Sequence, residues 1–224
     1  MAARLGKTLP CPLDAFWWLG YLGMDDIARR TDALVGGVDV VVFDTETHGG
    51  GGGVGQLIVQ LAFVAYRGGK EAYRRSHLVQ LPIGLSIMPR AREVHKISDA
   101  MLLQRGRHAA HELENFFWWT RLAKRVVAHN MAFDARAVRN TCAVFGINCA
   151  LCDEKLFCTM VSAKPFAGLV NKRGKPKNPK NSELYKLFNG HEPEETLHDA
   201  LADAKVTADN YFNGLHEGWW EDPE

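Results

Sequence analysis

Three apolar runs lie close together ahead of the helical segments, and this order restricts the fold more than any other feature of the chain. The runs are residues 38–43, 57–66 and 76–81. They are rich in β-branched residues, which favour strands, and glycine or charged residues bound them. Three strands in quick succession predict an antiparallel meander. The run of glycines at 49–53 is expected to form a flexible loop tip between the first two strands.

Helical patterns and one more strand follow this meander. Apolar residues recur at helical spacing in 98–124, which can hold two helices, and 125–128 is another short strand. A helix is predicted from Ala132 to Phe145, where Gly146 ends it. Further helices are expected at 182–188 and 199–215. Strands first and mixed elements afterwards predict an α/β domain with a partly antiparallel sheet.

Length and charge bound the class of protein without identifying a partner. A chain of 224 residues can bury one substantial core, and a net charge of +1 gives no sign of a nucleic-acid partner. The aromatic stretch at 16–22 is too short for a membrane span, because acidic residues flank it. We therefore expect a soluble, intracellular protein with no membrane partner. The expected organisation is an aromatic-rich extension at 1–36 and a catalytic domain at 37–224.

Five cysteines are present, and four of them are crowded between Cys142 and Cys158. Such clusters sometimes hold zinc, but only Cys149 and Cys152 have ligand-like spacing. Small buried thiols are the favoured interpretation, with structural zinc as the alternative.

Two carboxylates, Asp44 and Glu46, end the first predicted strand. Alternate residues of a strand project to the same side, so the two carboxylates face one site. Placed together they are costly unless a cation lies between them, and a hard divalent ion with oxygen ligands is the simplest choice. A solvated strand end is the alternative interpretation of this pair taken alone.

Two further acidic positions lie near predicted helix starts. Asp134 falls in the first turn of a helix that follows a strand, where a favourable charge at the helix N-terminus is the alternative interpretation. His198 and Asp203 are five residues apart, so on one continuous helix they would point about 140° apart. They can converge only if His198 lies outside the helix, and Asp199 is a good N-cap that would place it there. Without the other acids, His198 would be a surface histidine.

Together these positions resemble the DEDDh family of 3′→5′ exonucleases. Asp44-Thr45-Glu46-Thr47 is similar to the first motif of that family, and Ala128-His129-Asn130 with Phe133-Asp134 is similar to the second. The third is matched by His198, Ala200, Asp203 and Ala204, and the segment 94–98 resembles a short family segment between the first two. The resemblance covers residues 38–212 and implies a ribonuclease H-like fold, a central mixed sheet flanked by helices.

The resemblance also implies a mechanism with two divalent metal ions, Mg²⁺ or Mn²⁺. Asp44 would bridge the two ions, Glu46 and Asp203 would hold the ion nearer the attacking water, and Asp134 would hold the second, partly through water. His198 is the expected general base, because histidine accepts a proton near neutral pH. The product would be a nucleoside 5′-monophosphate.

The expected partner is a nucleic acid with a free 3′ end, with DNA favoured over RNA because Asp-Thr-Glu-Thr resembles the DNA-directed members. An exoribonuclease that trims RNA is the alternative. A second alternative is a proofreading accessory subunit, which would bind a polymerase or a different replication or repair protein through Trp17-Trp18. The simpler interpretation of those tryptophans is an extra helix packed on the domain. The candidate substrate-binding residues are Thr45, Thr47, Asn130, Phe133, Lys175, Lys177 and Lys180. For Phe133 packing is the favoured alternative, and for the lysines a solvated loop is.

Overall fold

The computed structural model describes residues 24–49, 55–194 and 198–223. Contacts divide the chain into one compact unit ending at Gly36 and another from Gly37 to Glu224. Helix α1, Met24–Gly36, belongs to the first unit. The tryptophan pair at 17–18 and the glycines from 50 to 53 lie outside the described residues. Within the part of the chain that is described, every helix is too short or too polar to cross a bilayer.

The second unit is built on a five-stranded mixed sheet with the order β3-β2-β1-β4-β5. Strand β1 pairs antiparallel with β2, which pairs antiparallel with β3. On its other side β1 pairs parallel with β4, and β4 pairs parallel with β5. The strands are β1 Val38–Thr47, β2 Ile58–Arg67, β3 Lys70–Leu78, β4 Ala123–Ala128 and β5 Leu156–Cys158. The predicted meander and the α/β class are both confirmed.

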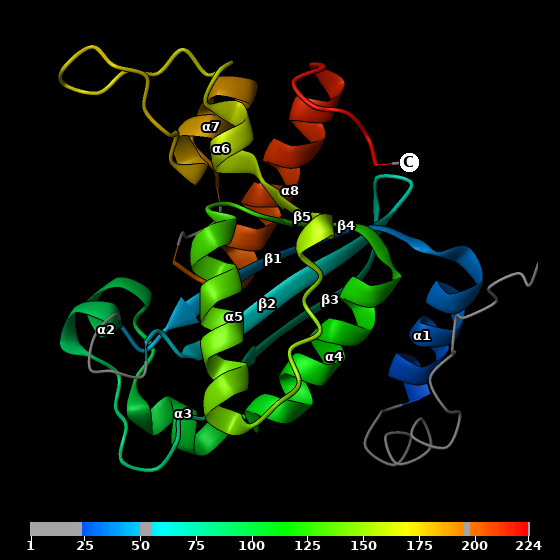
Figure 1. The fold of residues 1–224 in the computed structure, drawn as a ribbon, viewed down its shortest axis with the longest axis vertical. Coiled ribbons are helices and arrows are strands. Elements are labelled where there is room, and N and C mark those ends of the chain that lie inside the picture. The colour runs from blue at the N-terminus through cyan, green and yellow to red at the C-terminus, as the bar shows by residue number, and fades with distance from the viewer. Residues whose placement is uncertain (1–23, 50–54, 195–197, 224) are drawn as a thin grey trace, which may run out of the picture. The chain divides into compact units, whose positions relative to one another are not determined.

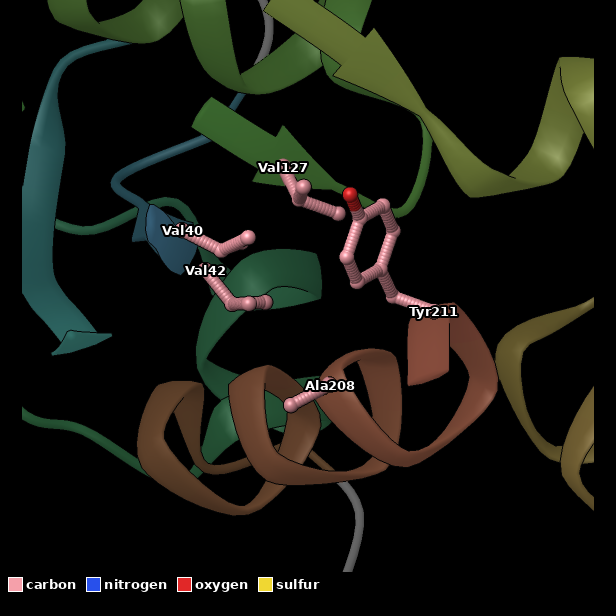
Figure 2. Close-up of a cluster of buried hydrophobic side chains, with 5 residues drawn as sticks. All are labelled: Val40, Val42, Val127, Ala208 and Tyr211. Atoms are coloured by element: carbon pink, nitrogen blue, oxygen red, sulfur yellow. The ribbon is translucent and has the colours of Figure 1, made fainter. Parts of the chain in front are cut away.

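The alternation of β1 side chains decides which helices cover each face of the sheet. Val40 and Val42 point to one face, where they pack with Val127 of β4 against Ala208 and Tyr211 of α8, Ala200–His216 (Figure 2). On the opposite face lie α4, Ala109–Leu122, and α5, Met131–Phe145, which Figure 1 shows in front of the strands. The C-terminal end of β1, which carries Asp44 and Glu46, thereby meets the N-terminal end of α8, which carries Asp203, at one edge of the buried apolar core.

On the α4 face the core is aromatic. Phe43 of β1 lies with its ring centroid 4.9 Å from that of Phe116 in α4, and Phe63 of β2 lies 5.6 Å from the same ring. Phe43, Phe63 and Phe116 are all fully buried. Large aromatic side chains contribute much of the apolar area that stabilises a core of this size. Packing on this face therefore holds β1 and β2 in place, and with them Asp44 and Glu46, which follow Phe43 in β1.

The third strand differs from its predicted bounds. It runs from Lys70 to Leu78 rather than over 76–81, and it is an edge strand because it pairs only with β2. Exposed charged residues, among them Lys70, Glu71 and Arg74, hide the strand pattern. Such charges are common on edge strands, where they discourage pairing with other chains. The first strand also runs on through Glu46 to Thr47, with a bulge between these two residues.

Several short elements were not predicted, and the long helical segment is two helices. The unpredicted elements are α2 Pro89–His95, β5 and α6 Thr159–Ala163, with a 3₁₀ turn at Asp153–Lys155. The segment 98–124 forms α3, Asp99–Arg105, and α4. Helix α7 is Asn181–Asn189, close to its predicted bounds. Elements of three to seven residues carry too few apolar positions to show a period.

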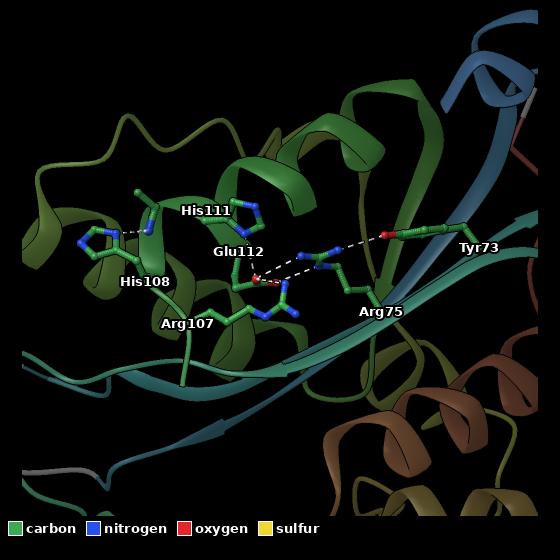
Figure 3. Close-up of polar contacts among 7 residues, drawn as sticks. Tyr73, Arg75, Arg107, His108, His111 and Glu112 are labelled. Carbon is green, nitrogen blue, oxygen red and sulfur yellow. Dashed lines mark hydrogen bonds and ion pairs between the residues drawn. The ribbon is translucent and has the colours of Figure 1, made fainter. Parts of the chain in front are cut away.

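A buried charge network joins the edge strand β3 to α4. Glu112 is 2% exposed and accepts two hydrogen bonds from Arg75, at 2.8 and 3.1 Å, and one from His111 Nδ1 at 2.9 Å (Figure 3). Burial alone would raise the pKa of Glu112, but the hydrogen bonds and charge of Arg75 lower it below its ordinary value. Removing one member of such a pair leaves a buried charge without compensation. The network therefore fixes the outer strand of the meander on α4.

Candidate active site

Three carboxylates meet where β1 ends and α8 begins. Asp44 and Glu46 lie two residues apart in β1, and Asp203 is in the first turn of α8. One oxygen from each carboxylate lies within 4.8 Å of the others. The expectation that strand alternation turns Asp44 and Glu46 toward one site agrees with this geometry. The sheet and α8 thus bring together acids that are far apart in the sequence.

The electrostatics of this cluster favour a bound cation. Burial, followed by the charges of Asp134 and Asp203, raises the pKa of Asp44 well above its ordinary value. Burial and the charge of Asp203 raise the pKa of Glu46 to about 8. The pKa of Asp203 is also raised, mainly by burial. Oxygen ligands crowded together in this way fit a hard divalent ion, which would replace the protons that the cluster otherwise retains.

Asp134 lies beside the cluster, on the first turn of α5. Its Oδ1 accepts hydrogen bonds from the backbone N–H of Thr45 at 3.1 Å and from the Thr45 hydroxyl at 2.7 Å. Asp134 is 2% exposed, and burial raises its pKa to about 7 although the bonds from Thr45 oppose this. Asp134 is not among the three carboxylates that converge within 4.8 Å. Thr45, one of the candidate substrate-binding residues, directs its hydroxyl to this carboxylate.

His198 lies outside α8, as its spacing from Asp203 requires. Asp199 is the N-cap, and its Oδ1 accepts hydrogen bonds from Leu201 N at 3.1 Å and Ala202 N at 3.2 Å. His198 precedes the cap with φ +74° and is exposed, and its backbone N–H donates to Asp203 Oδ2 at 2.8 Å. The predicted cap is confirmed, and it holds the backbone of His198 against a carboxylate of the cluster.

Two buried polar residues support the site, although their sequence positions did not predict this role. Gln60 of β2 donates from Nε2 to Asp199 Oδ2 at 2.9 Å. His95 donates from Nε2 to the carbonyl of Thr47 at 3.2 Å and accepts from Ile97 N at Nδ1. A polar residue inside the apolar run of β2 was the available signal for Gln60. For His95 the signal was the segment 94–98, which matched the family without a chemical role.

The other candidate substrate residues near the cluster lie on β1 and α5. Thr47 is 7% exposed at the end of β1. Asn130 is exposed at the N-cap position of α5 with φ +68°, a left-handed conformation that asparagine tolerates well. Phe133 is half-buried in the first turn of the same helix. Their roles toward a substrate stay predictions.

The basic loop that carries Lys175, Lys177 and Lys180 before α7 contains a turn held by its own hydrogen bonds. Val170 and Pro176 form an antiparallel bridge, and Asn171 Oδ1 caps the turn between them by accepting from Arg173 N and Lys175 N. An apolar hollow of about 340 Å³ lies against this turn. Its lining residues are Lys164, Pro165, Gly168, Leu169, Val170 and Pro176.

The three candidate lysines of this loop differ in their surroundings. Lys177 Nζ lies 2.6 Å from a carboxylate oxygen of Glu183, so its charge is already paired. Lys180 precedes α7 and donates its backbone N–H to Glu183 at 2.9 Å, while its side chain is exposed, as is that of Lys175. His129 ties the loop to β4 by donating from Nε2 to the carbonyl of Pro179 at 3.1 Å. The loop is therefore anchored beside the second motif.

Comparison with known proteins identifies the family. The chain matches the exonuclease family RNase_T over residues 41–211, which contain the carboxylate cluster and His198. The chain belongs to this family. It is a 3′→5′ exonuclease with a ribonuclease H-like fold, as the sequence motifs predicted. No curated protein matches the sequence directly.

Solved structures agree with this family. Exonuclease X in complex with 5′-overhanging duplex DNA is 26% identical, covers 82% of this chain and 95% of its own, and superposes with a TM-score of 0.59. The nuclease domain of 3′hExo, a DEDDh family member bound to rAMP, is 12% identical, with coverages of 80% and 92% and a TM-score of 0.64. Exonuclease I from E. coli with a dA16 oligonucleotide is 16% identical and has a TM-score of 0.63. That match covers 79% of this exonuclease but only 40% of exonuclease I.

Proposed function

We propose that this exonuclease removes nucleotides one at a time from the 3′ end of DNA with two divalent ions, Mg²⁺ or Mn²⁺. The observation that carries the proposal is the convergence of Asp44, Glu46 and Asp203 within 4.8 Å, with Asp134 on the adjoining helix. When bound, two such ions would activate the attacking water and stabilise the leaving oxygen of the phosphodiester. Asp44, Glu46 and Asp203 would hold the ion on the side of the attacking water, and Asp44 and Asp134 would hold the other.

His198 is proposed as the general base. It is solvent-exposed, and its own backbone bond to Asp203 keeps it at the edge of the carboxylate cluster. In the proposed step the imidazole accepts a proton from the attacking water, and the oxygen of that water forms a bond to the terminal phosphorus. The bond from phosphorus to the 3′ oxygen of the penultimate nucleotide breaks. The 3′ oxygen takes up a proton from solvent water, so that the shortened strand ends in a 3′ hydroxyl and a nucleoside 5′-monophosphate leaves.

Thr45 and Asp134 are proposed to act as a unit. Two hydrogen bonds from Thr45 hold one oxygen of Asp134, so the orientation of this carboxylate depends on β1. Fixed orientation matters because catalytic groups lose much of their effect when they are misplaced by about 1 Å. Thr47, Asn130 and Phe133 are proposed to contact the terminal nucleotide, since all three lie on the ends of β1 and α5 that flank the cluster.

The basic loop is proposed to bind phosphates of the strand behind its 3′ end. Lys175 and Lys180 expose their side chains, and the loop that carries them is anchored to His129, next to the second motif. Phosphate contacts of this kind position a strand without reading its sequence. Lys177 contributes less free charge than its neighbours, because Glu183 already pairs with it.

DNA is the proposed substrate class, and the complex of exonuclease X with duplex DNA supports this choice. RNA is the alternative to be tested, since the 3′hExo nuclease domain was solved with rAMP. A role in proofreading, with a polymerase bound through Trp17-Trp18, stays a proposal whose docking residues lie outside the described part of the chain.

One experiment tests the substrate and the metal together. End-labelled DNA and RNA oligonucleotides of one sequence are digested side by side with Mg²⁺ and with Mn²⁺. We expect release of mononucleotides from the 3′ end, faster for DNA. Asp44→Ala should abolish turnover with either ion while the fold is kept, and an unchanged digestion rate in this variant would refute the two-metal mechanism.

A second variant tests the general base. His198→Ala should lower kcat at neutral pH by about 100-fold or more, the usual contribution of a positioned base. Exposed His216, in the last turn of α8, is the matched control, and His216→Ala should retain the parental rate. A near-normal rate for His198→Ala would remove this residue from the role of base.

A further inference from the structure

Gln60 is a buried polar residue in the middle of β2, and its side chain connects three elements. It is 8% exposed within a strand whose other residues from Ile58 to Ala65 are apolar and buried. Its Nε2 donates to Asp199 Oδ2 at 2.9 Å and to Ser76 Oγ at 3.2 Å. Its Oε1 accepts from the backbone N–H of Ala200 at 3.4 Å. A buried amide with these partners stabilises one defined arrangement of β2, β3 and α8.

The register of the sheet places this amide next to the metal cluster. Gln60 is the Cα partner of Glu46 in the antiparallel pairing of β1 and β2. Side chains of directly opposite residues project to the same face, with Cβ atoms roughly 5 Å apart. Gln60 and Glu46 therefore share the face on which α8 packs. The amide lies between the strand that carries two of the carboxylates and the helix that carries the third.

The residues that Gln60 holds are the N-cap and the first residue of α8. Asp199 is flanked by His198 on one side, and its backbone carbonyl accepts from Asp203 N at 2.9 Å. Helix ends tend to fray, and the first backbone N–H groups of a helix have no partner within it. Gln60 satisfies one of these groups, at Ala200, and also holds the capping carboxylate. The start of α8 is thereby held beside the residue of β2 that pairs with Glu46.

Gln60 is uncharged, and for its role beside Asp199 this matters as much as its hydrogen bonds. Gln60 Nε2 lies 2.9 Å from a carboxylate oxygen of Asp199, the N-cap of the helix that carries Asp203. A donor that binds Asp199 without adding another carboxylate is therefore needed at this point, and an amide provides it. Ionised glutamate has nearly the same shape, but its acceptor-only head would face the carboxylate of Asp199.

We propose that Gln60 is a positioning residue of the exonuclease, which acts through Asp199 to set His198 and Asp203 against Glu46. This inference rests on the proposed roles of His198 and Asp203. Neither Gln60 nor Asp199 is required to touch the substrate. The consequence is that exchanging the donor and the acceptor between positions 60 and 199 should preserve the site, whereas changing one alone should not.

The test is a double-mutant cycle with Gln60→Glu, Asp199→Asn and the double variant. In Gln60→Glu two carboxylates face each other, and we expect kcat to fall by about tenfold to 100-fold, the scale of a misplacement of about 1 Å, with KM nearly unchanged. In the double variant, the amide introduced at position 199 can donate to the carboxylate introduced at position 60. It can still cap the helix, because asparagine is as good an N-cap as aspartate. That variant should recover most of the parental kcat.

Two controls and two further readouts separate positioning from general stability. Ser76→Ala removes only the hydrogen bond between Gln60 Nε2 and Ser76 Oγ and should leave kcat unchanged. Thr141→Val removes a buried bond from α5 to Ile58 of the same strand, so it should lower Tm without lowering kcat. Hydrogen exchange of the Leu201 and Ala202 amides in the metal-free protein should accelerate in Gln60→Glu and recover in the double variant. Mn²⁺ affinity by calorimetry should follow the same order.

The outcomes are distinguishable. A kcat for Gln60→Glu that stays within twofold of the parental value, or a double variant no better than Gln60→Glu, would overturn the proposal. If Gln60→Glu does not fold, Gln60→Met replaces it, and the same fall in kcat is required. Because every variant is compared with an active parental enzyme, a parental protein without nuclease activity would instead contradict the proposed function.

Discussion

Metal binding to the carboxylate cluster should release protons, so the affinity for the ion should increase with pH. In the metal-free protein burial and the charge of Asp203 raise the pKa of Glu46 to about 8, and burial raises that of Asp134 to about 7. Below its pKa, each carboxyl that must deprotonate weakens binding about tenfold per pH unit. Glu46 alone therefore predicts about 100-fold tighter binding between about pH 6 and pH 9, and Asp134 adds about tenfold if it joins the site.

The same shifts fix the sign of the effect on stability. A carboxyl whose pKa is raised in the folded chain holds its proton more firmly there than in the unfolded chain. Its contribution is present below the unfolded pKa and is lost as pH rises through the folded one. The metal-free protein should accordingly lose stability as pH rises from the unfolded value of Glu46, 4.5, toward about 8. Saturating metal should remove this dependence, because the ion binds the ionised form.

Calorimetric titration with Mn²⁺ in two buffers of different ionisation enthalpy measures both the affinity and the protons released. We expect the proton release from Glu46 and Asp134 to be larger near pH 6 than at neutral pH, and to approach zero above about pH 9, where both of these carboxyls are already ionised. Glu46→Gln should release fewer protons, and exposed Glu93→Gln, outside the cluster, should match the parental protein. A dissociation constant that changes by less than about threefold across this range would refute the reasoning.

Two other predictions concern stability and substrate affinity. Glu112→Gln leaves Arg75 and its neighbours without their buried anion, so the free energy of unfolding in urea should fall by about 3 kcal/mol or more; a loss below about 1 kcal/mol would show that the network contributes little. Replacing Lys175 and Lys180 with alanine should flatten the plot of log affinity against log salt by up to about 1.4 units on single strands, while kcat barely changes. The same measurement on Lys177→Ala should show a smaller effect, since its charge is paired, and a parental slope in the Lys175 and Lys180 variant would show that the loop is only a solvated surface.

The sequence by itself determined which acidic residues and histidine to expect at the site, and it determined the class of the fold. Strand alternation is a local property of the backbone, so Asp44 and Glu46 could be placed on one face without knowing the rest of the molecule. The cap at Asp199 is local in the same way, and it explains why His198 and Asp203 can converge although they are five residues apart. The order of the motifs along the chain then predicted the family.

Tertiary structure alone decided which residues hold those side chains in place. Thr45 meets Asp134 across 89 residues and Gln60 meets Asp199 across 139, and no local pattern encodes such contacts. Their partners are set by the register of β1 and β2 and by the packing of α5 and α8 on opposite faces. The charged edge strand β3 was misplaced for a related reason. Its charged residues discourage pairing with other chains, and only the assembled sheet shows that this strand lies at an edge where such charges are useful.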